Sequence, residues 1–247
     1  MSTIAMGEQN SPRTGGWDQY SAGRLLSRNR LIFYHHRLVM EYFLSYFYRL
    51  PTDLKALDVG CGDGFFLESL RNLGFMDVQG IDASQPFVDI CRSKGLKVEP
   101  GSVYQFPGDA VYDAVLCCEV LEHLNDPGLA LERIKGVLSD RGFIFVTVPI
   151  AASLQKRWRR LAHGETALGQ LKQIDGTHRH VFTVRSFKDM AAHAGLSASS
   201  FWVGSNPFPF DEFLKRHGLA ALAHWLQRRT FLGTCGDCLA MVLAKGR

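Results

Sequence analysis

The residues best suited to bind a ligand lie in one short run, Leu57-Asp58-Val59-Gly60-Cys61-Gly62-Asp63-Gly64. The run follows an apolar segment and leads into a helical pattern, which indicates a turn between a strand and a helix. Glycines let the backbone turn sharply and approach a ligand without a Cβ in the way. The carboxylate of Asp58 would repel a phosphate and attract a cation. The turn therefore predicts a ligand whose nearest group is positively charged.

A second acid follows the next predicted strand, in Gly80-Ile81-Asp82. An acid at that position of a nucleotide-binding sheet accepts hydrogen bonds from ribose hydroxyls. Two phosphate-binding motifs are excluded, because G-x-G-x-x-G would need a glycine where Phe65 stands and no G-K-[ST] follows the turn. Together the two acids predict an adenosyl sugar that carries a cationic extension.

These acids need a framework, and the apolar pattern predicts short strands that alternate with amphipathic helices. Strands are predicted at 56–59, 77–81, 96–98, 112–117 and 143–148, and helices at 65–73, 86–93 and 127–138. Such alternation produces right-handed crossovers and a parallel sheet with helices on both faces, which is an α/β fold. Beyond it we expect helices at 150–161 and 186–194 and strands at 199–203 and 239–243.

Composition excludes several classes of protein. With 247 residues, of which 46% are hydrophobic and 21% charged, the chain can build a large core without disulfides. No segment approaches the roughly 20 apolar residues of a membrane-spanning helix, and residues 1–16 lack the pattern of a secretion signal. A net charge of +4 is modest for a nucleic-acid-binding protein. We therefore expect a cytoplasmic protein with a flexible tail at 1–16 and no nucleic-acid partner.

Four motifs in register resemble those of class I S-adenosylmethionine-dependent methyltransferases of the small-molecule type, including the ubiquinone-pathway O-methyltransferases. They are D-V-G-C-G-D-G, G-I-D-A-S, Y-D-A-V-L-C-C-E-V-L-E-H-L and L-S-D-R-G-F-I-F-V-T-V-P, all within residues 50–150. The resemblance implies a Rossmann-like, seven-stranded mixed sheet of order 3-2-1-4-5-7-6, with strand 7 antiparallel and helices on both faces. It further implies a helical cap at 17–50 and a methyltransferase domain at 51–247, with acceptor-lid insertions at 151–180 and 204–234.

The resemblance assigns a set of residues to the cofactor, S-adenosyl-L-methionine. They are Asp58, Gly60, Cys61, Gly62, Asp63, Gly64, Asp82, Ala83, Ser84, Ser102, Val103, Cys118 and Glu119. Within this set, Asp58 lies close to the ammonium group, Asp82 binds the ribose, and Ser102 and Val103 lie at the adenine. Cys118 and Glu119 face the methionine end.

Methyl transfer is an in-line displacement on a sulfonium, so the protein mainly aligns the reactants. A general base that deprotonates a hydroxyl adds to the rate. The candidate bases are His178 and His180, which alternation places on one side of an extended segment, and His123. An alternative interpretation of Glu119-Val-Leu-Glu122-His123 is a Mg²⁺ site, because residues i, i+3 and i+4 share a helical face. A purely structural role for these segments is the competing interpretation.

The leading hypothesis is O-methylation of a small-molecule hydroxyl. Lys156 to Arg160 form a basic helical face in the first insertion, which would suit an anionic or lipid-linked acceptor or peripheral contact with a membrane. The alternatives are a metal-dependent RNA 2′-O-methyltransferase, with Glu119, Glu122, His123 and one of His178 or His180 as ligands, and an S-adenosylmethionine-binding protein without catalysis. The identity of the acceptor and the oligomeric state are open at this point.

Overall fold

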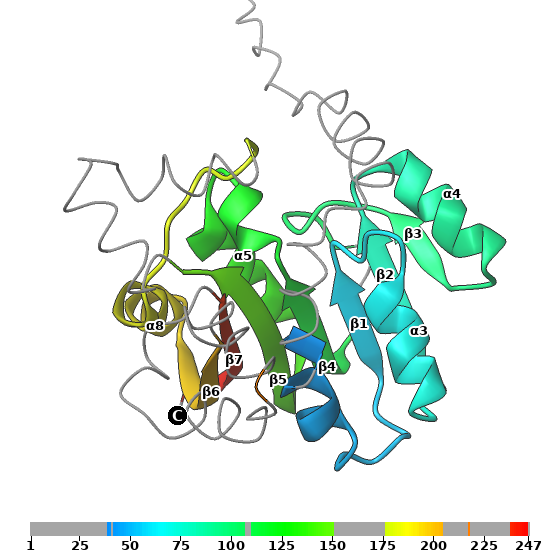
Figure 1. Ribbon diagram of the computed structural model, residues 1–247, viewed down its shortest axis with the longest axis horizontal. Helices are drawn as coiled ribbons and strands as arrows, with labels where there is room; N and C mark the ends of the chain where they lie inside the picture. The colour runs from blue at the N-terminus through cyan, green and yellow to red at the C-terminus, as the bar shows by residue number, and fades with distance from the viewer. Residues whose placement is uncertain are drawn as a thin grey trace, which may run out of the picture.

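The computed structural model describes residues 39–40, 42–106, 110–150, 176–204, 217 and 238–246 (Figure 1). Its strands are β1 (Ala56–Val59), β2 (Val78–Asp82), β3 (Val98–Pro100), β4 (Tyr112–Cys118), β5 (Leu138–Pro149), β6 (Leu196–Gly204) and β7 (Cys238–Lys245). Its helices are α3 (Phe65–Asn72), α4 (Gln85–Ser93), α5 (Pro127–Gly136) and α8 (Val184–His193), with a 3₁₀ turn, η1 (Leu121–His123). The basic segment 156–160, the predicted tail and most of both predicted insertions lie outside these residues.

The strands form one seven-stranded sheet of order β3-β2-β1-β4-β5-β7-β6. Neighbours from β3 to β5 are parallel, whereas β7 pairs antiparallel with both β5 and β6. The predicted order and the antiparallel strand 7 are therefore confirmed. Most predicted element bounds are shifted, and the largest shift is at β5, which was expected to begin at residue 143 and begins at Leu138. The preceding helix, expected to reach residue 138, therefore ends at Gly136, because Leu138 already pairs with Tyr112.

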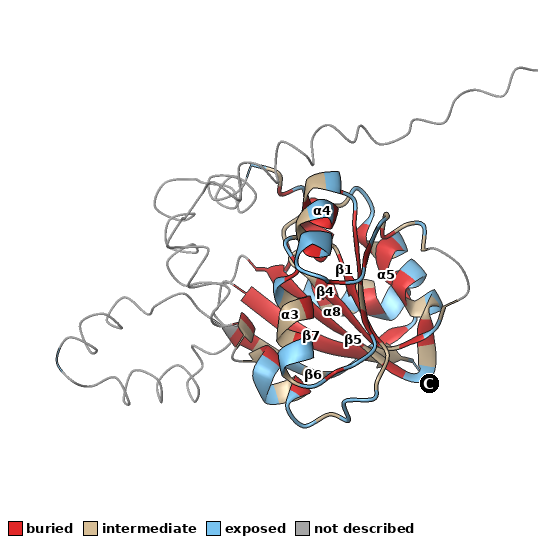
Figure 2. Ribbon diagram, turned by 90° about the vertical axis from the view of Figure 1, so that its right-hand side faces the viewer, coloured by how far each residue is buried: buried red, intermediate tan, exposed pale blue. Residues whose placement is uncertain are grey.

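Two hydrophobic cores lie on opposite faces of the sheet, because alternate side chains of each strand point to opposite sides. On one face, Val115 and Cys117 of β4 belong to a core that includes buried residues of α5 and α8. On the other face, Ala114 and Leu116 belong to a core with α3 and α4. Figure 2 shows buried strands between helices whose outer surfaces are exposed.

A helical segment ahead of the sheet, residues 39–40 and 42–47, packs on the face that carries α3. Phe43 and Phe47 are fully buried, with ring centroids 4.4 Å apart, and both contact Phe145 of β5. This segment is part of the region expected to form a helical cap, and its aromatic residues fix it to the sheet. Within the part of the chain that is described, no helix is long and apolar enough to cross a lipid bilayer.

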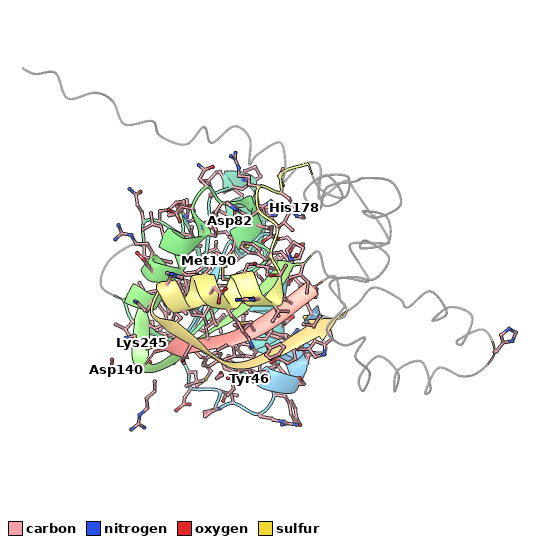
Figure 3. The ribbon with its side chains drawn as sticks, turned by 90° about the vertical axis from the view of Figure 1, so that its left-hand side faces the viewer. Tyr46, Asp82, Asp140, His178, Met190 and Lys245 are labelled. Atoms are coloured by element: carbon pink, nitrogen blue, oxygen red, sulfur yellow. The ribbon has the colours of Figure 1, made fainter. Side chains whose placement is uncertain are left out.

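The carboxyl ends of β1, β2 and β4 meet at one edge of the sheet because these strands are parallel neighbours. This is the edge at which open α/β sheets bind ligands. Figure 3 shows Asp82 and His178 toward the same end of the molecule and Tyr46 toward the opposite end.

Candidate active site

The turn after β1 is shaped by glycines with positive φ. Gly60 has a φ of +70°, and a Cβ there would lie 2.5 Å from Cγ2 of Val120 in the turn after β4. Gly62 has a φ of +56° with no atom near the position of a Cβ, so it is required for backbone conformation rather than for space. The Gly60 amide donates to the Ile81 carbonyl at 2.8 Å. The turn is thus held against the end of β2.

Asp82 joins this turn to the start of α4. Its Oδ2 accepts a hydrogen bond from the Gly62 amide and its Oδ1 accepts one from the Ser84 amide, each at 2.8 Å. The carboxylate is 9% exposed. Because each carboxylate oxygen can accept more than one hydrogen bond, the group can hold the turn and still accept hydroxyl donors from a ligand.

Asp58 lies beneath the turn and is 1% exposed. Burial is the main cause that raises the pKa of its carboxyl to about 8, and the nearby carboxylates of Asp82 and Asp63 raise it further. Its Oδ2 makes no hydrogen bond to the described residues. A cation brought close to this group would favour its ionised form, which is the chemistry expected from the sequence.

A pocket of about 260 Å³ opens between the turn after β1, the N-terminal part of α3 and the end of β4. Its lining residues are Val39, Gly60, Cys61, Gly62, Asp63, Phe65, Phe66, Phe87, Cys118 and Glu119. The pocket therefore combines backbone amides and carboxylates with an aromatic wall. A ligand with one polar and one apolar part fits this lining.

The predicted cofactor residues fall into two groups in this structure. Six of them line the pocket, namely Gly60, Cys61, Gly62, Asp63, Cys118 and Glu119. The others lie behind or beside it: Asp58 and Asp82 as described, Gly64 and Ser84 as the N-caps of α3 and α4, Ala83 exposed between β2 and α4, and Ser102 and Val103 in the loop after β3. The structure thus arranges these residues along one edge of the sheet.

Several lining residues escaped the sequence prediction. The sequence predicts Phe65 and Phe66 only as apolar positions of a helix, but this helix begins directly at the glycine turn, so both residues border the pocket. Phe87 does the same in the first turn of α4. Val39 reaches the pocket from the segment that precedes the sheet. The available signal was the place of these rings. Phe65 and Phe66 directly follow the glycine turn, and Phe87 lies in the first turn of the next helix.

Glu119 leaves β4 with a φ of +56° and is outside the 3₁₀ turn that follows. Thr147 of β5 donates from Oγ1 to Glu119 Oε1 at 2.9 Å, and the Glu119 amide donates to the Thr147 carbonyl at 3.0 Å. The expectation that Glu119, Glu122 and His123 share a helical face is therefore wrong. The chain turns at Glu119, which directs its side chain toward β5.

A buried cluster forms on the other side of that turn. Glu122, His123 and His178 are at most 7% exposed, and one ligand atom from each lies within 4.8 Å of the others. The two imidazole rings have centroids 4.9 Å apart, and Thr177 Oγ1 lies 2.8 Å from His123 Nδ1. The carbonyl of Glu122 accepts hydrogen bonds from the amides of the following segment, 179–180. The cluster attaches residues 177–180 to η1.

None of the three candidate bases lines the pocket. His123 and His178 are in the buried cluster and do not line the pocket, and His180 Nε2 donates to the Leu124 carbonyl at 2.8 Å.

The cluster does not fit the Mg²⁺ site that the sequence suggested. Mg²⁺ prefers oxygen ligands, whereas this group offers one carboxylate and two imidazoles. Nitrogen donors suit transition metals. Glu119, which would have supplied the second carboxylate, is held by Thr147 instead.

Residues 32–200 match the sequence pattern of a family described as a methyltransferase domain. The ubiquinone biosynthesis O-methyltransferase of Colwellia psychrerythraea is 30% identical over 138 residues, which cover 52% of this chain and 54% of that protein. The protein of the same name from Hydrogenovibrio crunogenus is 30% identical over 175 residues, which cover 66% of this chain and 68% of that protein. The chain thus spans about half to two thirds of the length of these relatives.

Solved structures share the fold over most of the chain. The partner protein in a complex with the Haloferax volcanii Trm112 methyltransferase activator aligns with a TM-score of 0.64 and 18% identity, covering 93% of this chain and 99% of that one. The plantazolicin methyltransferase BpumL, solved with SAH, aligns with a TM-score of 0.60 and 21% identity, covering 93% and 90%. At these identities the similarity concerns the fold.

Proposed function

The chain belongs to the class I S-adenosylmethionine-dependent methyltransferases, and from that premise we propose that it methylates a hydroxyl oxygen of a small molecule. The observation that carries the proposal is the composition of the pocket, in which the glycine turn shares one space with three phenylalanines and a carboxylate. The curated relatives named above are O-methyltransferases, which supports oxygen as the acceptor atom.

When bound, S-adenosylmethionine supplies an electrophilic methyl group on a positively charged sulfur. We assign its binding to the residues at the edge of the sheet. Asp82 has the capacity to accept the ribose hydroxyls while it keeps Gly62 and Ser84 in place. Asp58 can lose its proton and become the counter-charge of the ammonium group, since its pKa of about 8 lies close to neutral pH.

The aromatic wall favours an acceptor with an apolar ring or chain. Phe65, Phe66 and Phe87 border the pocket together with Val39, and aromatic rings bind one another with a geometric preference beyond simple burial. Contacts with these rings would orient a phenol or quinol so that its hydroxyl lies within the pocket. Such an acceptor would need no charge to bind. A lipid-linked acceptor and peripheral contact with a membrane stay predictions, because the basic segment 156–160 lies outside the described residues.

Transfer of a labelled methyl group tests this proposal. The whole chain is incubated with S-[methyl-¹⁴C]adenosylmethionine and, separately, with a phenol, a catechol, a quinol, a sugar and a short RNA, and labelled products are separated. We expect a labelled methyl ether from a phenolic hydroxyl, formed together with an equal amount of S-adenosylhomocysteine. Labelled RNA would favour the RNA alternative, and cofactor binding without any product would favour the non-catalytic one.

A further inference from the structure

Glu119 occupies an unusual position in the pocket. Among the described residues other than glycine, it is the one with a positive φ, and it directly follows β4 at the edge where the strands end. Non-glycine residues in this conformation are uncommon, and they gather at functional sites where the surrounding structure holds them. Here the conformation keeps the side chain at the pocket while the chain continues into η1.

The carboxylate is oriented from two other strands. Thr147 of β5 is fully buried and donates from its hydroxyl to Glu119 Oε1 at 2.9 Å. Cys238, the first residue of β7, approaches the same oxygen with its thiol at 3.9 Å. A carboxylate fixed from the sheet in this way is held in one orientation relative to the glycine turn, which is the requirement for a group that acts on a reacting atom.

Another acid also borders the pocket, but it is placed differently. Asp63 is exposed on the turn itself, where Lys94 binds its backbone carbonyl. The histidines proposed from the sequence lie in the buried cluster or bind backbone. Among the described residues, Glu119 is therefore the lining carboxylate that the sheet orients.

Building on the function proposed above, we propose that Glu119 is the catalytic carboxylate that receives the acceptor's hydroxyl proton. The acceptor O–H bond breaks and its proton passes to the Glu119 carboxylate, while the oxygen forms a bond to the methyl carbon. The C–S bond breaks and its electron pair stays on sulfur, which leaves neutral S-adenosylhomocysteine and a methyl ether. The proton then leaves Glu119 for solvent.

As the proposed base, Glu119 lies next to the reacting methyl group, so its charge acts on the cofactor even when no acceptor is bound. A carboxylate at the methyl-transfer end of the pocket attracts the positive sulfonium of S-adenosylmethionine and has no such attraction for the neutral sulfur of S-adenosylhomocysteine. Glu119 should therefore distinguish methyl donor from product by charge. Thr147 acts as a positioning residue for that carboxylate.

Calorimetric titration of both compounds into wild type and Glu119→Gln tests the charge effect. We expect the variant to bind S-adenosylmethionine about tenfold more weakly, with the affinity for S-adenosylhomocysteine within about twofold of wild type. Glu132→Gln, an exposed change on α5, is the matched control and should leave both affinities unchanged. The proposal would be overturned if the variant lost affinity equally for both compounds, or if neither affinity changed. If Glu119→Gln does not fold, Glu119→Asn serves instead, because asparagine tolerates a positive φ.

The kinetic test uses whichever hydroxyl compound wild type methylates. Glu119→Gln should lower kcat by about 10²- to 10⁴-fold with little change in KM, and the limb of the pH–rate profile that reports the base should disappear. Thr147→Val should lower kcat less and keep that limb. Unchanged kcat in Glu119→Gln would overturn the assignment. If wild type methylates no hydroxyl, the proposed function fails and Glu119 is not the base of such a reaction, and the two cofactor affinities still decide whether its charge acts on the sulfonium.

Discussion

Asp58 carries a carboxyl group that keeps its proton at neutral pH. Its pKa of about 8, against an ordinary value of 3.8, reflects burial first and the neighbouring carboxylates second. Between pH 3.8 and about pH 8, the folded protein keeps a proton on Asp58 that the unfolded chain releases. The contribution of Asp58 to the free energy of unfolding therefore falls as the pH rises through this window and levels off above about pH 8.

Replacing Asp58 with asparagine should remove this dependence. Relative to the variant, the wild-type free energy of unfolding should fall by about 1 kcal/mol per pH unit between pH 5 and pH 8, so Asp58→Asn is expected to be the more stable protein at pH 8. Urea denaturation at pH 5, 6.5 and 8 measures the difference. Asp53→Asn, an exposed change before β1, should follow wild type. Parallel curves for Asp58→Asn and wild type would show that the buried carboxyl is already ionised.

At the scale of residues, the two acids that shape the site could be predicted from the sequence. The phenylalanines that border the pocket could not. Asp58 and Asp82 could be assigned because their place relative to a strand end determines what they face. Phe65 and Phe87 belong to helices, and a helical apolar position predicts burial against the sheet without showing which rings border a cavity. Glu119 could be placed after a strand, but its left-handed conformation leaves no trace in a hydrophobic pattern.

At the scale of elements, the turn after β1 and the turn after β4 form one unit. Gly60→Ala would place a methyl group 2.5 Å from Val120 Cγ2 and force a side chain into a φ of +70°. We expect it to destabilise the fold by about 1–3 kcal/mol and to weaken binding of S-adenosylhomocysteine. Val120→Ala in the same chain should restore part of both losses because it removes the clash and leaves the backbone strain. Strictly additive effects in calorimetry and thermal unfolding would contradict this coupling.

We expect the cluster of Glu122, His123 and His178 to attach residues 177–180 to η1 and not to hold a catalytic metal. Its donor set does not suit Mg²⁺, and the backbone carbonyl of Glu122 already binds residues 179–180. Treatment with EDTA, followed by metal analysis of the protein, should therefore leave cofactor affinity and methyl transfer unchanged. Activity lost to EDTA and restored by added Mg²⁺ would support the metal-dependent alternative.

The elements themselves were largely predictable, with errors where two patterns meet. β1 has the predicted bounds, Ala56–Val59, because a short apolar run between polar residues and glycines leaves little choice. The spacing of Glu119, Glu122 and His123 predicted a helical face, but a three-residue 3₁₀ turn stands there. Spacing alone cannot separate one turn of α-helix from a 3₁₀ turn that follows a left-handed residue.

At the scale of the whole molecule, the sheet determines where the chemistry can occur. Parallel pairing of β1 with β2 and β4 brings the glycine turn, Asp82 and Glu119 to one edge, although they are far apart in the sequence. The alternation of strands and helices predicted the parallel part of the sheet. The antiparallel insertion of β7 between β5 and β6 came from the family resemblance, because isolated apolar strands near the end of a chain do not reveal their partners.

The central claim is that this edge of the sheet is a binding site for S-adenosylmethionine built around Asp82. Calorimetric titration of S-adenosylmethionine into wild type and Asp82→Ala tests it directly, with circular dichroism as the check on folding. We predict saturable binding to wild type and at least about 100-fold weaker binding to the variant, because a charged acceptor of ribose hydroxyls and the anchor of Gly62 are lost together. An Asp82→Ala protein that folds normally and binds with unchanged affinity would contradict the account.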